Sequence, residues 1–310
     1  MGVPLRSVVL LSSDCSAGGA TGPTPTGKKY SVVATAYPVF EAVGRIGGKR
    51  VHATNLAPVG AFDNVILTPT REKKLREAAV VFILGKGTQP QIERIAAQRR
   101  GPTIALLDTV AATAPIFESR LESAVNPYVW LDPKKMAQIA ERVRLGLAAY
   151  DPNGTSAFRK NAKRWGKTVA ALDRFGARVT ATCKKRELIT TQPVYEYLTD
   201  RYGIDQVPLP LDGPSTRRGT TGSSDRPSDA TLAAIVERYR PQTIYFSVLP
   251  TIAEAERYLK SYGFRSAVLD PIADQSDHVR RGGGNYSSMM GLNLDAVKAG
   301  LDCDDISPGD

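Results

Sequence analysis

The sequence predicts an α/β protein of two lobes, each a parallel sheet covered by helices, joined by one long backbone helix. Three observations predict this fold. The length of 310 residues suits two domains at roughly 150 residues each. From Tyr30 onward, short β-rich runs alternate with helical segments, which is typical of parallel sheets layered with helices. A long segment with helical spacing, residues 155–180, separates the two alternating regions.

The N-terminal lobe contains four predicted strands. Residues 30–153 are expected to hold strands at 30–35, 51–56, 80–84 and 103–107, and helices at 39–46, 69–78, 91–98 and 133–150. Pro69 behind Thr68 suits the first turn of a capped helix, and Gly47-Gly48 suits a helix end. Asp132 is the expected cap of the last helix of this lobe.

The connecting helix and the C-terminal lobe follow. The helix is expected within residues 154–182, because Phe158, Trp165 and Val169 begin an apolar series that continues at helical spacing. The lobe, 183–303, is expected to hold strands at 187–191, 243–247 and 266–269 and helices at 194–202, 228–238, 252–262 and 286–301, before a tail at 304–310. Residues 208–229 are rich in Gly, Pro, Ser and Thr, and their length predicts a functional or disordered loop.

Composition excludes several classes of protein. Hydrophobic residues make up 42% and charged residues 23%, so neither a disordered nor a fibrous chain fits. Only two histidines and three cysteines occur, without CxxC or HxxxH spacing, which leaves little material for a His/Cys zinc cage. No nucleophile–base pair or phosphate loop can be named, so we expect no enzyme activity.

The net charge of +10 suits several anionic partners: nucleic acid, a membrane surface or an anionic ligand. The basic residues are scattered over many predicted elements, and no helix-turn-helix, zinc finger or RNA-binding motif occurs. We therefore expect no nucleic-acid partner.

Residues 1–29 differ from the rest of the chain. Arg6, the apolar run 8–11 and Cys15 before a Gly/Thr/Pro-rich stretch resemble the end of a bacterial lipoprotein signal, in which Cys15 is lipidated. The apolar run is shorter than the roughly 7–15 residues of a signal, and Asp14 replaces the small neutral residue expected before the cysteine. A disordered terminus and a mis-assigned start codon are the alternatives. No run approaches the ~18 apolar residues of a membrane span, so an anchor is the only membrane attachment we expect.

A family resemblance rests on specific residues. The octapeptide Asn126-Pro127-Tyr128-Val129-Trp130-Leu131-Asp132-Pro133 resembles the Asn-Pro-His-x-Trp-Leu-Asp-Pro signature of the zinc/manganese ABC-transporter solute-binding proteins, the TroA/ZnuA-like cluster. Further matches are the segments 32–35, 56–60, 74–85, 190–192, 201–203, 269–271 and 286–295. The resemblance covers residues 30–301.

This resemblance implies a function as well as the two-lobed fold. It implies a periplasmic or lipid-anchored receptor, monomeric, that binds a divalent metal ion or another small ligand and delivers it to an ABC permease. It also implies four ligand positions, which fall on Asp63 or Asn64, Tyr128, Gln192 and Asp270 of this chain. The family uses histidine at the first two, and His or Glu at the third, so this chain is a divergent member with most metal ligands replaced.

The replaced ligands change the expected chemistry. Zinc favours imidazole and thiolate, whereas Asp, Asn, Gln and Tyr oxygens suit Ca²⁺, Mg²⁺ or Mn²⁺. Asp63 and Asp270 are the candidate metal ligands, for manganese, zinc or a harder ion. A neutral lining suits a metal complex or an organic ligand equally well. The alternative function is a surface adhesin or scaffold, derived from such a receptor, that no longer binds metal.

Cys183 precedes the first strand of the second lobe and Cys303 follows its terminal helix. In a parallel α/β layer both positions fall at the end of the sheet opposite the cleft. A disulfide between Cys183 and Cys303 is therefore predicted, which suits an oxidising compartment, and two free thiols are the alternative.

Overall fold

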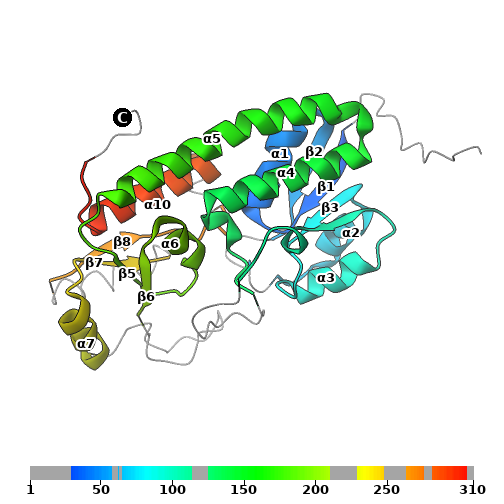
Figure 1. The fold of residues 1–310 in the computed structure, drawn as a ribbon. Coiled ribbons are helices and arrows are strands. Elements are labelled where there is room, and N and C mark those ends of the chain that lie inside the picture. Colours follow the sequence, from blue (N-terminus) through cyan, green and yellow to red (C-terminus); the bar gives the residue numbers. More distant parts are fainter. Residues whose placement is uncertain are drawn as a thin grey trace, which may run out of the picture.

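The molecule contains two parallel sheets, as the sequence predicts, and each has four strands among the described residues. The computed structural model describes residues 29–57, 62, 65–113, 125–209, 229–247, 263–275 and 281–305. The strand orders are β2-β1-β3-β4 and β6-β5-β7-β8, so both lobes share one topology. Figure 1 shows the two sheets on either side of the molecule, with α5 running above both.

The first lobe follows its predicted elements closely. Its bounds are β1 Tyr30–Ala34, α1 Tyr37–Gly47, η1 Gly48–Arg50, β2 Val51–Asn55, α2 Pro69–Glu77, β3 Val80–Ile83, α3 Pro90–Ala97, β4 Thr103–Ala105, η2 Leu106–Asp108, η3 Val129–Leu131, α4 Pro133–Tyr150 and η4 Pro152–Gly154. The caps predicted from sequence are present: Thr68 accepts from the backbone N–H of Arg71 at 3.4 Å, and Asp132 accepts from that of Lys134 at 2.7 Å. Gly48 adopts φ +55°, which favours glycine and ends α1.

The second lobe contains one strand that sequence analysis missed. Its bounds are β5 Glu187–Thr190, α6 Glu196–Tyr202, β6 Asp205–Pro208, α7 Asp229–Tyr239, β7 Thr243–Phe246, β8 Arg265–Val268 and α10 Tyr286–Gly300. β6 was not expected because it has no alternating apolar pattern and ends in proline. It lies at the sheet edge, where the missing N–H of Pro208 is tolerated. The predicted helix 252–262 lies outside the described residues.

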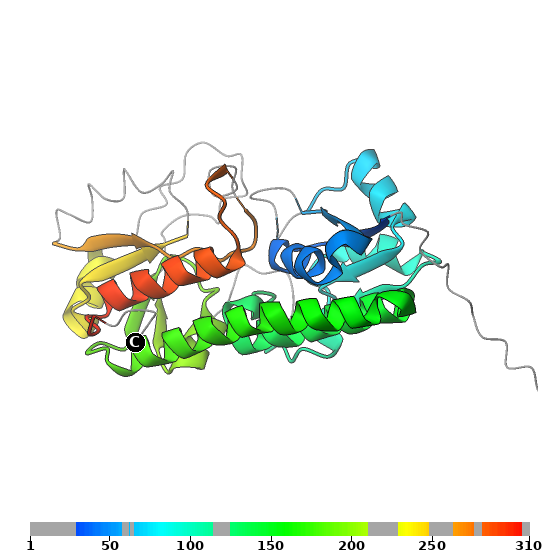
Figure 2. The same cartoon turned by 90° about the horizontal axis from the view of Figure 1, so that it is seen from above.

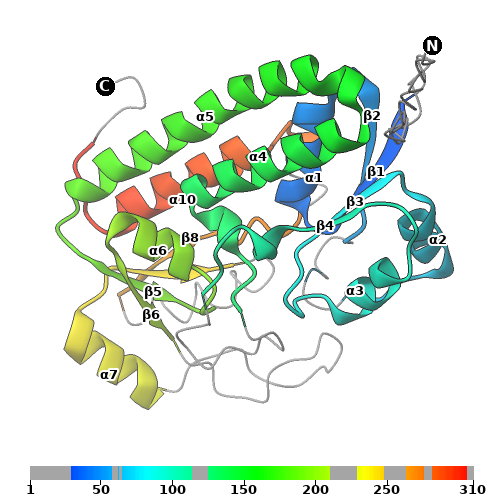
Figure 3. The same cartoon turned by 45° about the vertical axis from the view of Figure 1, so that its right-hand side comes forward.

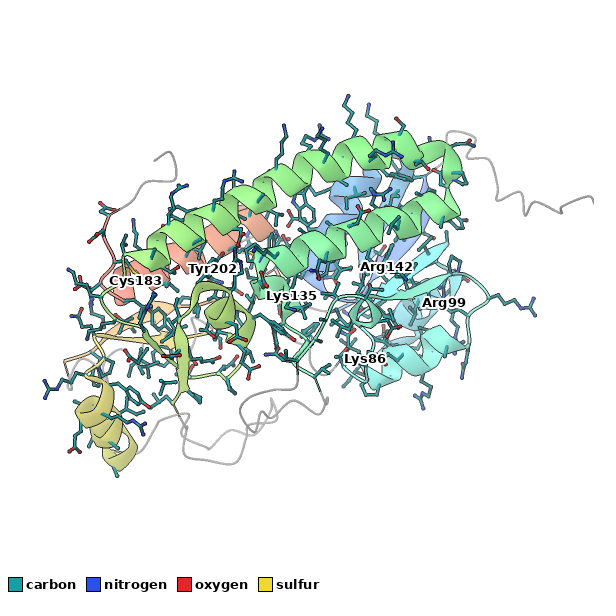
Figure 4. The ribbon with its side chains drawn as sticks, viewed as in Figure 1. Lys86, Arg99, Lys135, Arg142, Cys183 and Tyr202 are labelled. Atoms are coloured by element: carbon teal, nitrogen blue, oxygen red, sulfur yellow. A yellow bond between two sulfur atoms is a disulfide. The ribbon has the colours of Figure 1, made fainter. Side chains whose placement is uncertain are left out.

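The long helix α5, Thr155–Ala181, supports both lobes. Its 27 residues span about 40 Å, and Phe158, Trp165 and Val169 are among the side chains it buries. Figure 2 shows α1 and α10 lying end to end alongside it. Gly176 lets α6 approach, because a Cβ there would lie 2.4 Å from the ring of Tyr202, a residue labelled in Figure 4. No helix within the described ranges has the length and apolar character needed to cross a membrane.

Most of the core is shared between the lobes. The largest cluster runs from β1 through η3, α4 and α5 to α10, while separate clusters lie under α2 and α3 and under α7. A disulfide joins Cys183, after α5, to Cys303, after α10. The backbone N–H of Lys185 donates to the carbonyl of Leu301 at 3.1 Å, so the two chain segments run side by side there. Figure 4 labels Cys183 at the end of α5.

Candidate functional site

The two lobes meet along a seam, which we define as the contacts of α1 and residues 125–132 in the first lobe with α6, the loop after β8 and the start of α10 in the second. Trp130 is completely buried there, and its indole Nε1 donates to the carbonyl of Pro271 at 2.8 Å. The hydroxyl of Tyr286, at the start of α10, donates to the carbonyl of Trp130 at 2.7 Å. The segments that carry the predicted residues Tyr128 and Asp270 are therefore adjacent.

A buried carboxylate fixes a second part of the seam. Glu41 of α1 accepts from the backbone N–H of Tyr286 at 2.7 Å and from the hydroxyl of Tyr37 at 2.8 Å. A carboxylate at the N-terminus of α10 is also favoured by the helix dipole. Burial and the nearby Glu41 raise the pKa of the Tyr37 hydroxyl, which keeps this phenol a neutral donor. α1 and α10 are thus held together by hydrogen bonds across the lobes.

A third group of polar contacts connects the octapeptide to α6. Asn126 is fully buried, and its Nδ2 donates to Oε2 of Glu196 at 2.6 Å. The hydroxyl of Tyr197 donates to the carbonyl of Asn126 at 3.0 Å and accepts from the N–H of Thr113 at 2.9 Å. Sequence analysis missed Glu196 and gave Tyr197 no role in the site beyond a match to the family, because their partner lies about 70 residues away in the chain.

Tyr128 lies in an aromatic cluster at the seam. Its ring centroid is 5.5 Å from that of Phe62 and 5.5 Å from that of Trp130, and only 4% of the residue is exposed. Its backbone N–H donates to Oδ1 of Asn126 at 3.0 Å. Phe62 directly precedes Asp63 and Asn64 in the chain. Those two predicted ligands lie outside the described residues.

Asp270 lies two residues after β8, at the start of the loop that reaches the seam. Its carboxylate accepts from the N–H of Ile272 at 2.7 Å, and the Asn293 side chain binds both its backbone N–H and its carbonyl. Burial, with a smaller contribution from the neighbouring Asp274, raises the pKa of the Asp270 carboxyl to about 6 despite the lowering by the Ile272 N–H. The charged form of this carboxylate therefore gains from a bound cation.

Gln192 is exposed just after β5. Its carbonyl accepts from Oγ1 of Thr190 and from Nε2 of Gln206, each at 2.8 Å, so its backbone is fixed. Three residues later, the hydroxyl of Tyr195 donates to the carbonyl of Leu269, the residue before Asp270. The structure therefore brings together the segments that carry Tyr128, Gln192 and Asp270. No group of three or more His, Cys, Asp or Glu side chains able to hold a metal occurs among the residues that the structure describes.

The sequence of this chain is similar to those of known proteins. Residues 32–300 match the model of the family ZnuA, zinc-uptake complex component A, periplasmic. The chain is 29% identical over 180 residues to the zinc-binding lipoprotein AdcA of Streptococcus pneumoniae, covering 57% of this chain and 34% of that protein. It is 26% identical over 181 residues to the high-affinity zinc uptake system protein ZnuA of Bacillus subtilis, covering 57% and 54%. The chain thus spans about a third to a half of the length of these relatives.

Solved structures show the same fold. The metal-dependent lipoprotein YcdH from Bacillus subtilis superposes with a TM-score of 0.76 at 22% identity, covering 88% of this chain and all of that one. The periplasmic zinc-binding protein TroA from Treponema pallidum gives 0.71 at 19% identity, covering 88% and 99%. The family consists of solute-binding proteins and not of enzymes. With the family model matching nearly nine-tenths of its length, the chain belongs to the ZnuA family of metal-uptake solute-binding proteins.

Proposed function

We propose that this protein is the extracytoplasmic solute-binding component of a metal-type ABC importer. It binds its substrate at the seam and delivers it to a membrane permease, as a monomer held to the membrane by a lipid on Cys15. The observation that supports this most is the hydrogen bond from Trp130 to Pro271, because it brings the segments of Tyr128 and Asp270 together across the lobes. In open α/β sheets, ligands bind at this carboxyl edge of the strands.

The substrate we propose is a divalent cation, free or within a small complex. Asp63 and Asp270 provide negative charge, and Asn64, Tyr128 and Gln192 provide neutral oxygens. The relatives are named for zinc, yet this set contains no imidazole or thiolate. Oxygen donors favour harder ions. Compared with a histidine-lined site, we therefore expect this site to shift its preference from Zn²⁺ toward Mn²⁺ or an alkaline-earth ion.

Asp270 supports this assignment from the structure. Its carboxyl is partly buried near Asp274, and no cationic side chain in the described parts of the chain lowers its pKa. A bound cation offsets the desolvation of such a carboxylate. Asn293 holds the Asp270 backbone on both sides, so the carboxylate is positioned before the substrate arrives.

The experiment is metal analysis of the purified protein followed by thermal-shift titration with Zn²⁺, Mn²⁺, Fe²⁺, Ca²⁺ and Mg²⁺. We expect at least one ion to raise the melting temperature. Asp270→Asn should lower the affinity for that ion by at least roughly tenfold, which is the cost of losing even an outer-shell partner of a metal site. Tyr128→Phe tests the hydroxyl alone. Asp295→Asn, an exposed carboxylate on α10, is the matched control and should bind as the wild type does.

One outcome favours the alternative function. If the protein carries no metal and no ion shifts its melting temperature, the receptor hypothesis fails, and a receptor-derived adhesin or scaffold remains. If D270N and D295N weaken binding equally, a metal is bound but Asp270 is not a ligand.

A further inference from the structure

The outward side of α5 is strongly basic. Six cationic residues there are exposed, and we call them the α5 basic face: Arg159, Lys160, Lys163, Arg164, Lys167 and Arg174. At about 100° per residue they fall within an arc of about 140°, opposite the buried stripe that includes Trp165 and Val169. The single carboxylate of α5, Asp173, is paired with Arg201 at 2.7 Å. This face therefore presents positive charge alone.

These cations are unpaired within the described part of the chain. The salt bridges found there include none of the six, and Arg164 donates instead to the amide oxygen of Asn161 at 3.0 Å. Other helices of the molecule pair such residues within one turn, as Arg76 does with Glu72 at 2.8 Å and Arg144 with Glu141 at 2.5 Å. Like charges at i and i+4 also oppose helix formation, so the arrangement on α5 does not serve the fold.

The N-terminal end of the described chain lies at the same end of the molecule as the start of α5. The ring centroid of Tyr30 lies 4.9 Å from that of Tyr150, and Arg50 pairs at 2.5 Å with Asp151, which is separated from α5 only by η4. Figure 3 shows β1 and β2 beside the turn from α4 to α5. The 13 residues between Cys15 and Lys29 span at most about 45–50 Å, close to the length of α5. An anchor at Cys15 therefore keeps α5 within reach of the membrane surface.

We propose that the α5 basic face docks on the anionic phospholipid headgroups of the membrane. This inference goes beyond the proposed metal transport and depends only on its extracytoplasmic, membrane-anchored location. α5 lies along one edge of the molecule in Figure 1, and Figure 4 shows side chains projecting from its outer side. The exposed apolar residues on this side are small, such as Ala170 and Ala171, so contact is electrostatic and without insertion.

Electrostatic docking has a specific signature. Each Lys or Arg near an anionic surface strengthens binding roughly fivefold, and the attraction decays within a Debye length of about 10 Å at 0.1 M salt. Docking should therefore require anionic lipid and be reversed by salt. Tethering at Cys15 raises the effective concentration of the face at the membrane without any new contact.

The test uses the full chain with Cys15→Ser, so that lipidation does not contribute, in flotation with vesicles. Equimolar phosphatidylglycerol and phosphatidylcholine vesicles are compared with pure phosphatidylcholine at about 0.1 M and about 0.5 M NaCl. The variant K160Q/K163Q/R164Q/K167Q removes four charges from the α5 basic face. The control K74Q/R94Q/R100Q/K134Q removes four exposed charges from other parts of the first lobe.

We expect the parent chain to float with anionic vesicles at low salt only, the α5 variant to lose at least tenfold in partitioning, and the control to stay within about threefold of the parent. Three results overturn the proposal: no binding to anionic vesicles, an equal loss in both variants, or binding to soluble polyphosphate without binding to vesicles. Melting temperatures of both variants establish that they fold. Metal-dependent thermal shifts measured on the same variants separate failure of docking from failure of metal binding.

Discussion

The seam between the lobes and the α5 basic face use polar residues in opposite ways. At the seam, Glu41, Asn126 and Trp130 are buried and hydrogen-bonded to residues of the other lobe. On α5, six cations are exposed and form no ion pair with the described residues. An unsatisfied hydrogen-bonding group is costly only when it is buried. The seam therefore determines geometry and stability, whereas the charges of the α5 basic face can be removed with little effect on stability.

We expect the largest loss of stability at the seam from substitution of Trp130. Trp130→Ala removes a fully buried indole that packs against Phe62 and Tyr128, and we expect the free energy of unfolding to fall by about 3–5 kcal/mol. Trp130→Phe keeps an aromatic ring but loses the bond to Pro271, and should cost less. Urea unfolding measures both. A loss below about 1 kcal/mol for the alanine variant would show that the seam does not hold the lobes together.

Asn126→Ala tests the polar part of the seam. The variant takes a hydrogen-bond partner from Glu196 and from the N–H of Tyr128, both buried, so we expect a loss of about 2–3 kcal/mol. Asn153→Ala, an exposed asparagine in η4, serves as the control and should change stability by less than about 0.5 kcal/mol. Equal effects of the two variants in chemical denaturation would contradict the role assigned to Asn126.

Asp270 predicts a pH dependence of stability in the metal-free protein. Its carboxyl has a pKa of about 6 when folded, against 3.8 as its ordinary value. The folded state thus holds this proton more tightly, and the free energy of unfolding falls as pH rises from about 4 to about 6, by an amount of order 2 kcal/mol. Asp270→Asn should remove this fall while matching the wild type near pH 4. Parallel pH profiles of the two proteins would refute the assignment.

The smallest effect is expected on α5. Lys163→Ala removes an exposed, unpaired cation. The free energy of unfolding should stay within about 0.5 kcal/mol of the wild-type value, or rise slightly because like-charge repulsion is relieved. Thermal unfolding at low and high salt checks this. Destabilisation beyond about 1 kcal/mol would mean that the α5 basic face has a structural role, as the seam does.

Much of the fold was predictable because it depends on local patterns. The apolar spacing of α5, the Thr68-Pro69 helix start and the β-rich runs of both lobes need only neighbouring residues. β6 was missed because strand pairing, not its own polar sequence, creates it.

The candidate site was less predictable, because it depends on contacts between residues far apart in the sequence. Resemblance indicated Tyr128, Gln192 and Asp270, and the structure brings their segments together. The contacts that hold those segments come from Glu196, Tyr197, Tyr286 and Glu41, whose pairing depends on how the lobes are placed relative to one another. No local pattern encodes a hydrogen bond between residues 245 positions apart, as between Tyr286 and Glu41.

The disulfide between Cys183 and Cys303 makes the second lobe a covalently closed ring attached to the end of α5. A protease that cuts one peptide bond between these cysteines opens the ring without releasing a fragment. The nicked protein then migrates as one species without reductant and as two with it. Proteolysis in an oxidising compartment therefore leaves the second lobe attached to the first, and a cut in this half of the chain need not separate it from its anchor.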